Sequence, residues 1–184
     1  MPVLLSLYTA LICLGCLLCP AQAKAAVLAN GSYCIKMEGS DLQLAPSRYR
    51  QHARVVLMPA SPAQPWNFTH LGNDAYRISY KSLELDSQES KIYNGVPIII
   101  WPWHGGGNQR WVVRRVGKAY TLTSVYTKLA VDLKGNARQR GTVFQGYQKN
   151  NGASQRFDIV PCGSNAPQPK AVQKEEEWNT FHSK

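Results

Sequence analysis

A Gln-x-aromatic triplet occurs three times in this chain at nearly equal spacing. The triplets begin at Gln64, Gln109 and Gln155, which lie 45 and 46 residues apart, and they end at Trp66, Trp111 and Phe157. An Asp also precedes each triplet Gln by 23 residues, at Asp41, Asp86 and Asp132. Such a repeat indicates structural units that are each too small to bury a core and must stack on one another. The chain is therefore predicted to contain one domain of three units.

Short apolar runs bounded by Gly, Asn, Ser and Pro fill the repeat region, and no helical periodicity is present. Runs of this length and boundary predict β-strands. Four strands are expected in each unit: 32–37, 42–44, 54–59 and 66–71; 76–80, 83–86, 97–101 and 110–116; 120–124, 129–133, 143–147 and 156–160. Because no unit closes a sheet alone, the twelve strands are expected to share a core along a threefold axis.

The first 23 residues are expected to be a secretory signal peptide. Residues 3–19 are almost wholly apolar, and small residues follow at Ala21 and Ala23, which is typical of a cleaved signal. No Lys or Arg precedes the apolar run, so a membrane anchor is the alternative, although the run is short for a spanning helix. The expected domain covers 24–162, and a flexible charged tail is expected at 163–184.

Two cysteines lie outside the signal segment, Cys34 and Cys162, near the two ends of the repeat region. An even pair in an exported chain indicates a disulfide. Two separate buried thiols are the alternative.

The formal net charge is +10, and the Lys and Glu residues after position 162 cancel, so the excess lies in the repeat region. A basic surface favours anionic partners. No run of Lys or Arg exceeds two residues, and no specific nucleic-acid partner is expected.

These features resemble the ricin-type (ricin B-like) lectin family, whose members carry repeated Gln-x-Trp triplets. The second unit contains the family's sequence motifs in the same order: Leu85-Asp86, Asn94-Gly95, an apolar strand ending at Trp101, and the triplet. The third unit repeats this order from Val131-Asp132-Leu133 onward. The resemblance covers residues 32–162. It implies an all-β fold, a β-trefoil of three four-stranded repeats with pseudo-threefold symmetry. A trefoil brings the first and last strands together, which implies a bond between Cys34 and Cys162.

The resemblance separates structural residues from sugar-binding residues. The triplet aromatics can anchor the shared core, since each buries about 150–250 Å², and the triplet Gln amides can satisfy backbone groups at a turn. Sugar binding needs a carboxylate that accepts hydroxyl protons, a ring that stacks on the sugar's C–H face, and an amide that both donates and accepts.

The second and third units carry the residues that sugar binding requires. The expected carbohydrate-binding residues are Asp86, Trp101 and Asn108, then Asp132, Gln145 and Tyr147. In the third unit Ser154 replaces the amide, and Asn150 or Asn151 could compensate. The first unit has Asp41, but Val56 takes the ring position and Ala63 the amide position, so this unit is expected to be silent.

The leading interpretation is a secreted, extracellular or periplasmic, non-catalytic module that binds glycans or glycoconjugates. The alternative is a cell-binding or docking subunit of a multi-subunit toxin or secreted complex, with a protein partner at the tail or the basic surface. The chain has no recognisable catalytic motif, and Asp86 and Asp132 lie in different units, which argues against a glycosidase carboxylate pair. No catalytic residue, metal site or cofactor is expected.

Overall fold

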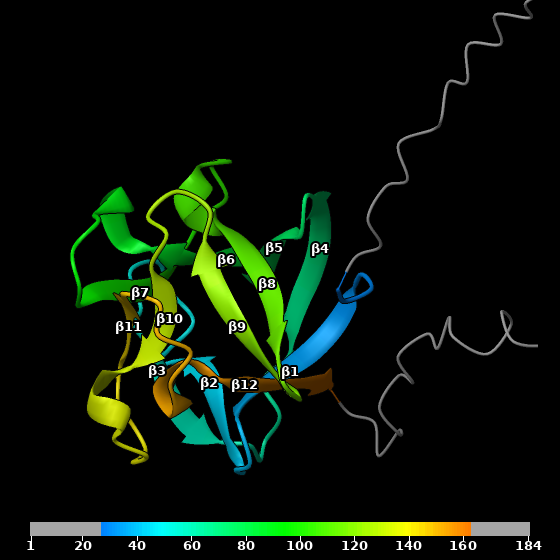
Figure 1. Cartoon of the computed structure of the whole chain (residues 1–184), viewed down its shortest axis with the longest axis vertical. Coiled ribbons are helices and arrows are strands. Elements are labelled where there is room, and N and C mark those ends of the chain that lie inside the picture. The colour runs from blue at the N-terminus through cyan, green and yellow to red at the C-terminus, as the bar shows by residue number, and fades with distance from the viewer. Residues whose placement is uncertain (1–26, 163–184) are drawn as a thin grey trace, which may run out of the picture.

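Twelve strands make up about half of residues 27–162, the part of the chain that the computed structural model describes (Figure 1). They are β1 Gly31–Met37, β2 Leu42–Pro46, β3 Val55–Pro59, β4 Trp66–Gly72, β5 Ala75–Tyr80, β6 Leu83–Ser87, β7 Val96–Trp101, β8 Arg110–Val116, β9 Ala119–Ser124, β10 Ala130–Leu133, β11 Phe144–Tyr147 and β12 Phe157–Pro161. Helix within this part is limited to the 3₁₀ turns η1 Gln88–Ser90, η2 Gly107–Gln109, η3 Lys134–Asn136 and η4 Ala153–Gln155.

The observed strands agree with the twelve expected from the sequence, and their ends differ by no more than two residues. The expected signal peptide (1–23) and tail (163–184) lie outside the described residues. Within 27–162 no helix has the length and apolar character needed to cross a membrane.

The first and last strands of the three units close a six-stranded antiparallel barrel. The pairs run around the ring as β1–β4, β4–β5, β5–β8, β8–β9, β9–β12 and β12–β1. Closure leaves the barrel without an open edge strand. The β1–β12 pair brings the two ends of the described domain side by side (Figure 1). The expected disulfide between Cys34 and Cys162 is confirmed, with their Cα atoms 4.9 Å apart.

The two middle strands of each unit form a hairpin: β2–β3, β6–β7 and β10–β11. The hairpins are joined to one another by isolated bridges at Arg54–Ile99 and Val56–Val143 and by a two-residue pairing of β11 with β7. The hairpins are therefore linked in a ring of their own, and the fold is the β-trefoil that the sequence predicts.

The aromatic residue of each triplet lies in the common core. Trp66, Trp111 and Phe157 have no exposed surface. The indole N–H of Trp66 donates to the carbonyl of Leu44, and that of Trp111 donates to the carbonyl of Leu85, both at 2.9 Å. Each bond ties a hairpin to the barrel strand that carries the triplet.

These two bonds correct the expected place of Asp41. Because both carbonyls accept from the triplet indole, Leu44 in the first unit corresponds to Leu85 in the second. The next residue, Ala45, therefore corresponds to Asp86. Asp41 instead lies in the turn before β2, where its side chain is 99% exposed and lies 3.5 Å from Lys36. The bonds span 22 residues in the first unit and 26 in the second, so counting back from the triplet aligned the wrong residue.

The strand register also corrects the expected ring position of the first unit. Trp101 lies opposite Glu84 and Tyr147 lies opposite Ala130. The corresponding pair in the first hairpin is Met58 opposite Gln43. Met58, rather than Val56, therefore stands where the other two units have an aromatic ring.

Candidate functional site

The carboxylate of Asp86 forms the base of the candidate site in the second unit. Asp86 lies on β6 and is 2% exposed. The turn η2 places Asn108 beside it, and the Asn108 Nδ2 donates to both carboxylate oxygens at 3.1 Å and to the Ser87 carbonyl at 3.3 Å. A buried carboxylate is costly unless it is hydrogen-bonded, so this amide holds Asp86 in place.

His104 approaches the same carboxylate from the loop before η2. Its Nε2 lies 3.5 Å from Asp86 Oδ2, and its Nδ1 accepts the Gly106 N–H at 3.2 Å. A neutral ring with Nδ1 as acceptor carries its proton on Nε2, which faces Asp86. A Cβ at Gly106 would lie 2.5 Å from both Asn108 Oδ1 and His104 Cε1. Glycine is therefore required for this loop to bring His104 and Asn108 together.

Burial raises the pKa of the Asp86 carboxyl above its ordinary value. Hydrogen bonding from Gln109 and Asn108 and the nearby His104 act in the opposite direction but do not overcome the burial. Removal of the carboxylate from water disfavours its charged form, which is the reason for the upward shift.

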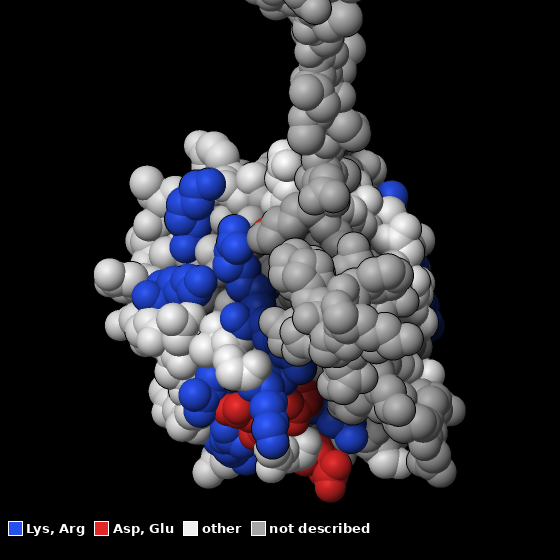
Figure 2. Space-filling view, turned by 45° about the vertical axis from the view of Figure 1, so that its right-hand side comes forward, with Lys and Arg blue, Asp and Glu red and all other residues white. Residues whose placement is uncertain are grey.

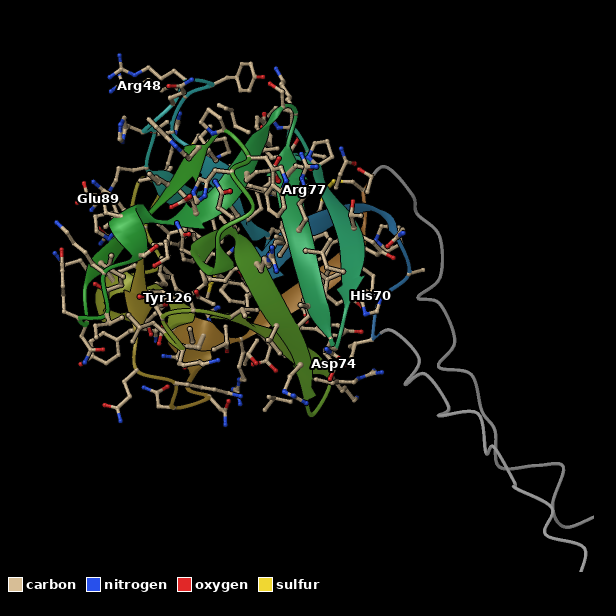
Figure 3. All side chains as sticks on the ribbon, turned by 90° about the horizontal axis from the view of Figure 1, so that it is seen from above. Arg48, His70, Asp74, Arg77, Glu89 and Tyr126 are labelled. Carbon is tan, nitrogen blue, oxygen red and sulfur yellow. A yellow bond between two sulfur atoms is a disulfide. The ribbon has the colours of Figure 1, made fainter. Side chains whose placement is uncertain are left out.

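A hollow of about 350 Å³ opens above Asp86. Asp86 lines it from β6, and Ile99 and Trp101 line it from β7. Asn108 and His104 line it from the η2 loop. The turn η1 supplies the remaining rim, including Glu89, which is labelled in Figure 3. Glu89 and Ser90 have positive φ angles of 56° and 55°. The structure thus brings Asp86, Trp101 and Asn108 together around one hollow.

His52 also lines this hollow, although no sequence motif points to it. It belongs to the loop between β2 and β3 of the first unit. Its imidazole centroid lies 4.1 Å from the Trp101 ring, with 52° between the ring planes. A sequence motif defined within one repeat does not predict a contact between two repeats, such as that of His52 with Trp101.

The third unit surrounds its Asp with three internal donors. Asp132 Oδ1 accepts from Gln145 Nε2 at 3.1 Å, while Oδ2 accepts from Ser154 Oγ at 2.8 Å and from Gln155 Nε2 at 3.1 Å. Ser154 thus takes the part that Asn108 has in the second unit. An ionised carboxylate offers about four acceptor sites, and three are already used. Tyr147, on the same hairpin, is 38% exposed.

Asn150 and Asn151 support the triplet Gln of the third unit. Their backbone N–H groups donate to Gln155 Oε1 at 2.9 and 3.2 Å. In the second unit Gln109 Oε1 accepts the His104 N–H at 2.9 Å, and Gln109 Nε2 donates to the Pro102 carbonyl at 2.8 Å. In both units the triplet amide therefore fixes the loop that closes the site.

The first unit has a hollow without a carboxylate. It measures about 330 Å³ and its lining includes Ala45, Met58, Gln64 and Arg140. Ala45 and Met58 stand where the second unit has Asp86 and Trp101. This hollow therefore lacks both the anionic acceptor and the flat ring.

Lys and Arg side chains gather on part of the face shown in Figure 2, with a smaller group of Asp and Glu side chains among them. Three arginines of the domain form ion pairs: Arg156 with Glu38 at 2.7 Å, Arg77 with Glu84 at 2.6 Å and Arg114 with Asp74 at 3.4 Å. Within residues 27–162 no group of three or more His, Cys, Asp or Glu side chains could hold a metal ion.

The chain matches the family model described as "Ricin-type beta-trefoil lectin domain-like" over residues 62–147 and 107–168. A stretch of 58 residues is 34% identical to the main hemagglutinin component type C of Clostridium botulinum C phage. That stretch covers 29% of this chain and 20% of the hemagglutinin component, so the match spans about a fifth of the relative's length.

Solved structures share the fold at low sequence identity. ThreeFoil, a designed threefold-symmetric protein, superposes with a TM-score of 0.68 at 22% identity, over 71% of this chain and 99% of ThreeFoil. A Polyporus squamosus lectin, solved with the epitope Neu5Aca2-6Galb1-4GlcNAc, gives 0.63 at 23% identity, over 73% of this chain and 50% of the lectin. At these identities the likeness establishes the fold.

Proposed function

Because this chain belongs to the family of ricin-type β-trefoil lectin-like domains, we propose that it is a secreted, non-catalytic module that binds glycans through its second unit. One observation carries the proposal: the Asp86 carboxylate, held by Asn108, lines a hollow that Trp101 also lines. A carboxylate accepts hydroxyl protons, and an indole face packs on the C–H face of a sugar ring. A carboxylate and an indole that line one hollow suit a ligand with several hydroxyl groups.

The charge inside the hollow favours a neutral sugar over an acidic one. The hollow is lined by the carboxyl groups of Asp86 and Glu89, and like charges in such a confined space repel. The basic face in Figure 2 is a separate surface property, which favours approach to negatively charged cell surfaces by long-range attraction.

We rank the third unit below the second. The Ser154 hydroxyl stands in the third unit where the second unit has the Asn108 amide, and Asp132 already accepts hydrogen bonds from three side chains. Asp132, Gln145 and Tyr147 therefore form a weaker second site. Two sites on one rigid domain would increase retention on a glycan-coated surface by avidity.

A glycan array with the 24–162 domain tests the proposal. Asp86→Ala is expected to abolish most of the retention, because each hydrogen bond to a charged group contributes about 1.5–3 kcal/mol. Asp41→Ala is the matched control, since Asp41 is exposed and does not line the hollow. Retention that survives Asp86→Ala and Asp132→Ala together would remove the proposed sites.

A second candidate function is a role as a subunit of a larger assembly. The match to a hemagglutinin component favours it, and the basic face offers a surface for an acidic partner. Size-exclusion chromatography of the protein from its native source, at high salt, would distinguish a stable complex from a free module.

A further inference from the structure

Three backbone hydrogen bonds link neighbouring repeats at equivalent positions. The donors are the N–H groups of His52, Gly95 and Gly141, and the acceptors are the carbonyls of Ile100, Gly146 and Leu57, at 3.1, 2.9 and 2.8 Å. The acceptors correspond to one another, because they lie opposite Leu85, Val131 and Leu44 in their hairpins. The donors therefore occupy one structural position, which each repeat places beside the hairpin of another repeat.

His52 is the exception among these three donors. All three have left-handed backbone conformations, with φ of 63° at His52, 95° at Gly95 and 87° at Gly141. Glycine adopts this conformation freely, whereas a residue with a Cβ is strained there. Two repeats thus use glycine and the first repeat uses histidine. Strain of this kind persists where the surroundings fix it, and it clusters at binding sites.

The side chain of His52 enters the hollow of the second unit. Its ring contacts Trp101 at a centroid distance of 4.1 Å, and it faces the η1 turn that carries Glu89. Among the described residues no hydrogen bond involves either imidazole nitrogen of His52. Both nitrogens remain available to donate to or accept from a ligand hydroxyl.

We infer that His52 is a specificity-determining residue of the second-unit site, supplied to it by the first repeat. The inference rests on the proposed glycan-binding function. His52, the η1 turn and the η2 loop line the hollow from three segments. A ligand hydroxyl that meets the imidazole can donate to it or accept from it, so the site is expected to distinguish neutral sugars by the position of their hydroxyl groups.

The variant His52→Gly restores the residue that the other two repeats have at this position. It removes the imidazole and also the backbone strain, so the domain is expected to fold with no loss of stability. The probe is an array of neutral oligosaccharides that end in galactose, N-acetylgalactosamine, glucose or mannose. Affinity for the preferred sugar is expected to fall about two- to tenfold, which corresponds to one neutral hydrogen bond. The ranking of the four sugars is also expected to change, because the lost contact is to a ligand hydroxyl.

Two further variants separate recognition from folding. His52→Asn tolerates the left-handed conformation and keeps a donor and an acceptor, so it should fall between wild type and His52→Gly. Gln51→Ala changes the exposed neighbour, which does not line the hollow, and should match wild type. A structural role alone would move the unfolding midpoint and leave the ranking of glycans unchanged.

Asp86→Ala on the same array distinguishes failure of the inference about His52 from failure of the proposed glycan-binding function. If Asp86→Ala abolishes binding while His52→Gly keeps the wild-type affinities and ranking, the inference about His52 is overturned and the glycan site stands. If neither substitution changes glycan retention, the proposed function itself fails and the role of His52 fails with it.

Discussion

The amide nitrogen of Asn108 lies 3.1 Å from each carboxylate oxygen of Asp86, so one side chain spans both acceptors of the other. Asn108 is 4% exposed and Asp86 2% exposed. A buried acceptor that loses its donor costs about 1–3 kcal/mol, and more when it is charged. This pair therefore links the stability of the second unit to its candidate binding chemistry.

Asn108→Ala is expected to lower the free energy of unfolding by about 1–3 kcal/mol, because Asp86 loses its closest hydrogen-bond donor. It is also expected to weaken glycan binding, since the carboxylate is no longer held in one orientation. Urea denaturation and glycan binding measure the two effects. Asn67→Ala, on an exposed position of β4, is the control and should change neither. An unchanged unfolding midpoint for Asn108→Ala would contradict the assigned role.

Three tryptophans within eleven residues are expected to respond differently to replacement by alanine. Trp111 has no exposed surface and its indole donates to Leu85, so Trp111→Ala should cost about 3–5 kcal/mol of stability. Trp101 lines the hollow, so Trp101→Ala should mainly reduce glycan binding. Trp103 is 36% exposed and contacts Arg77 instead. Trp103→Ala is the matched control, and binding equal to that of wild type is expected.

If Trp101→Ala keeps full glycan affinity while Trp103→Ala loses it, the ligand lies on the other face of the loop. Binding measured by isothermal titration, with thermal unfolding of the same samples, would show which tryptophan contributes to which property.

The repeat period was readable from the sequence because it is fixed by packing. Trp66, Trp111 and Phe157 must fill one core at equal intervals, so their spacing survives in the chain. The same period led to a wrong equivalence between Asp41 and Asp86. The first unit is four residues shorter between Leu44 and Trp66 than the second is between Leu85 and Trp111. Counting back a fixed number of residues from the triplet therefore selects Asp41 in the first unit, although Ala45 is the residue that corresponds to Asp86.

The part of the candidate site that the sequence missed comes from contacts between repeats. His52 meets Trp101 because the loop before β3 crosses to β7, where Arg54 pairs with Ile99. No local pattern around His52 encodes that crossing. The internal donors to Asp132 were also missed, because the reach of Gln145 and Ser154 depends on side-chain direction rather than on order in the chain.

Glycan binding by the second unit is expected to weaken as the pH falls. Burial raises the pKa of Asp86, so its carboxyl becomes protonated at a higher pH than an ordinary Asp, whose pKa is about 3.9. The protonated group accepts fewer hydroxyl protons. Binding measured between neutral and acidic pH should therefore decline before an exposed carboxyl would titrate. Affinity that stays constant down to a pH of about 4 would contradict this prediction.

The same shift has the opposite sign for stability. Because the folded state holds the Asp86 proton more tightly than the unfolded state, this group's favourable contribution is fully present below the unfolded pKa of about 3.9. It is lost as the pH rises through the folded pKa. Wild type should therefore gain stability relative to Asp86→Ala as the pH is lowered from above the folded pKa of Asp86 to below its unfolded pKa. Urea denaturation at a series of pH values measures it.

Gly106→Ala is expected to damage the second site without touching its carboxylate. The added Cβ would lie 2.5 Å from Asn108 Oδ1 and His104 Cε1, so both side chains must move. Glycan affinity should fall as a result. Gly152→Ala is the counterpart in the third unit, where a Cβ would lie 2.9 Å from Asn150 Oδ1. Asn150 does not donate to Asp132 through its side chain, so this variant should leave second-unit binding unchanged. Equal losses in both variants would indicate a general effect on folding.

Loss of the disulfide is expected to reduce stability while leaving glycan binding intact. Cys34 and Cys162 are 128 residues apart in sequence, and closing so long a loop contributes about 4–5 kcal/mol in the chain-entropy model. This is an upper value, because β1 already pairs with β12 and holds the chain ends together. The double variant Cys34→Ala, Cys162→Ala should therefore unfold at a lower urea concentration than wild type. Neither cysteine lines the hollow above Asp86, so folded protein should keep its affinity. Denaturation of wild type with and without a reducing agent gives the same comparison, and identical midpoints would show that strand pairing alone fixes the ends.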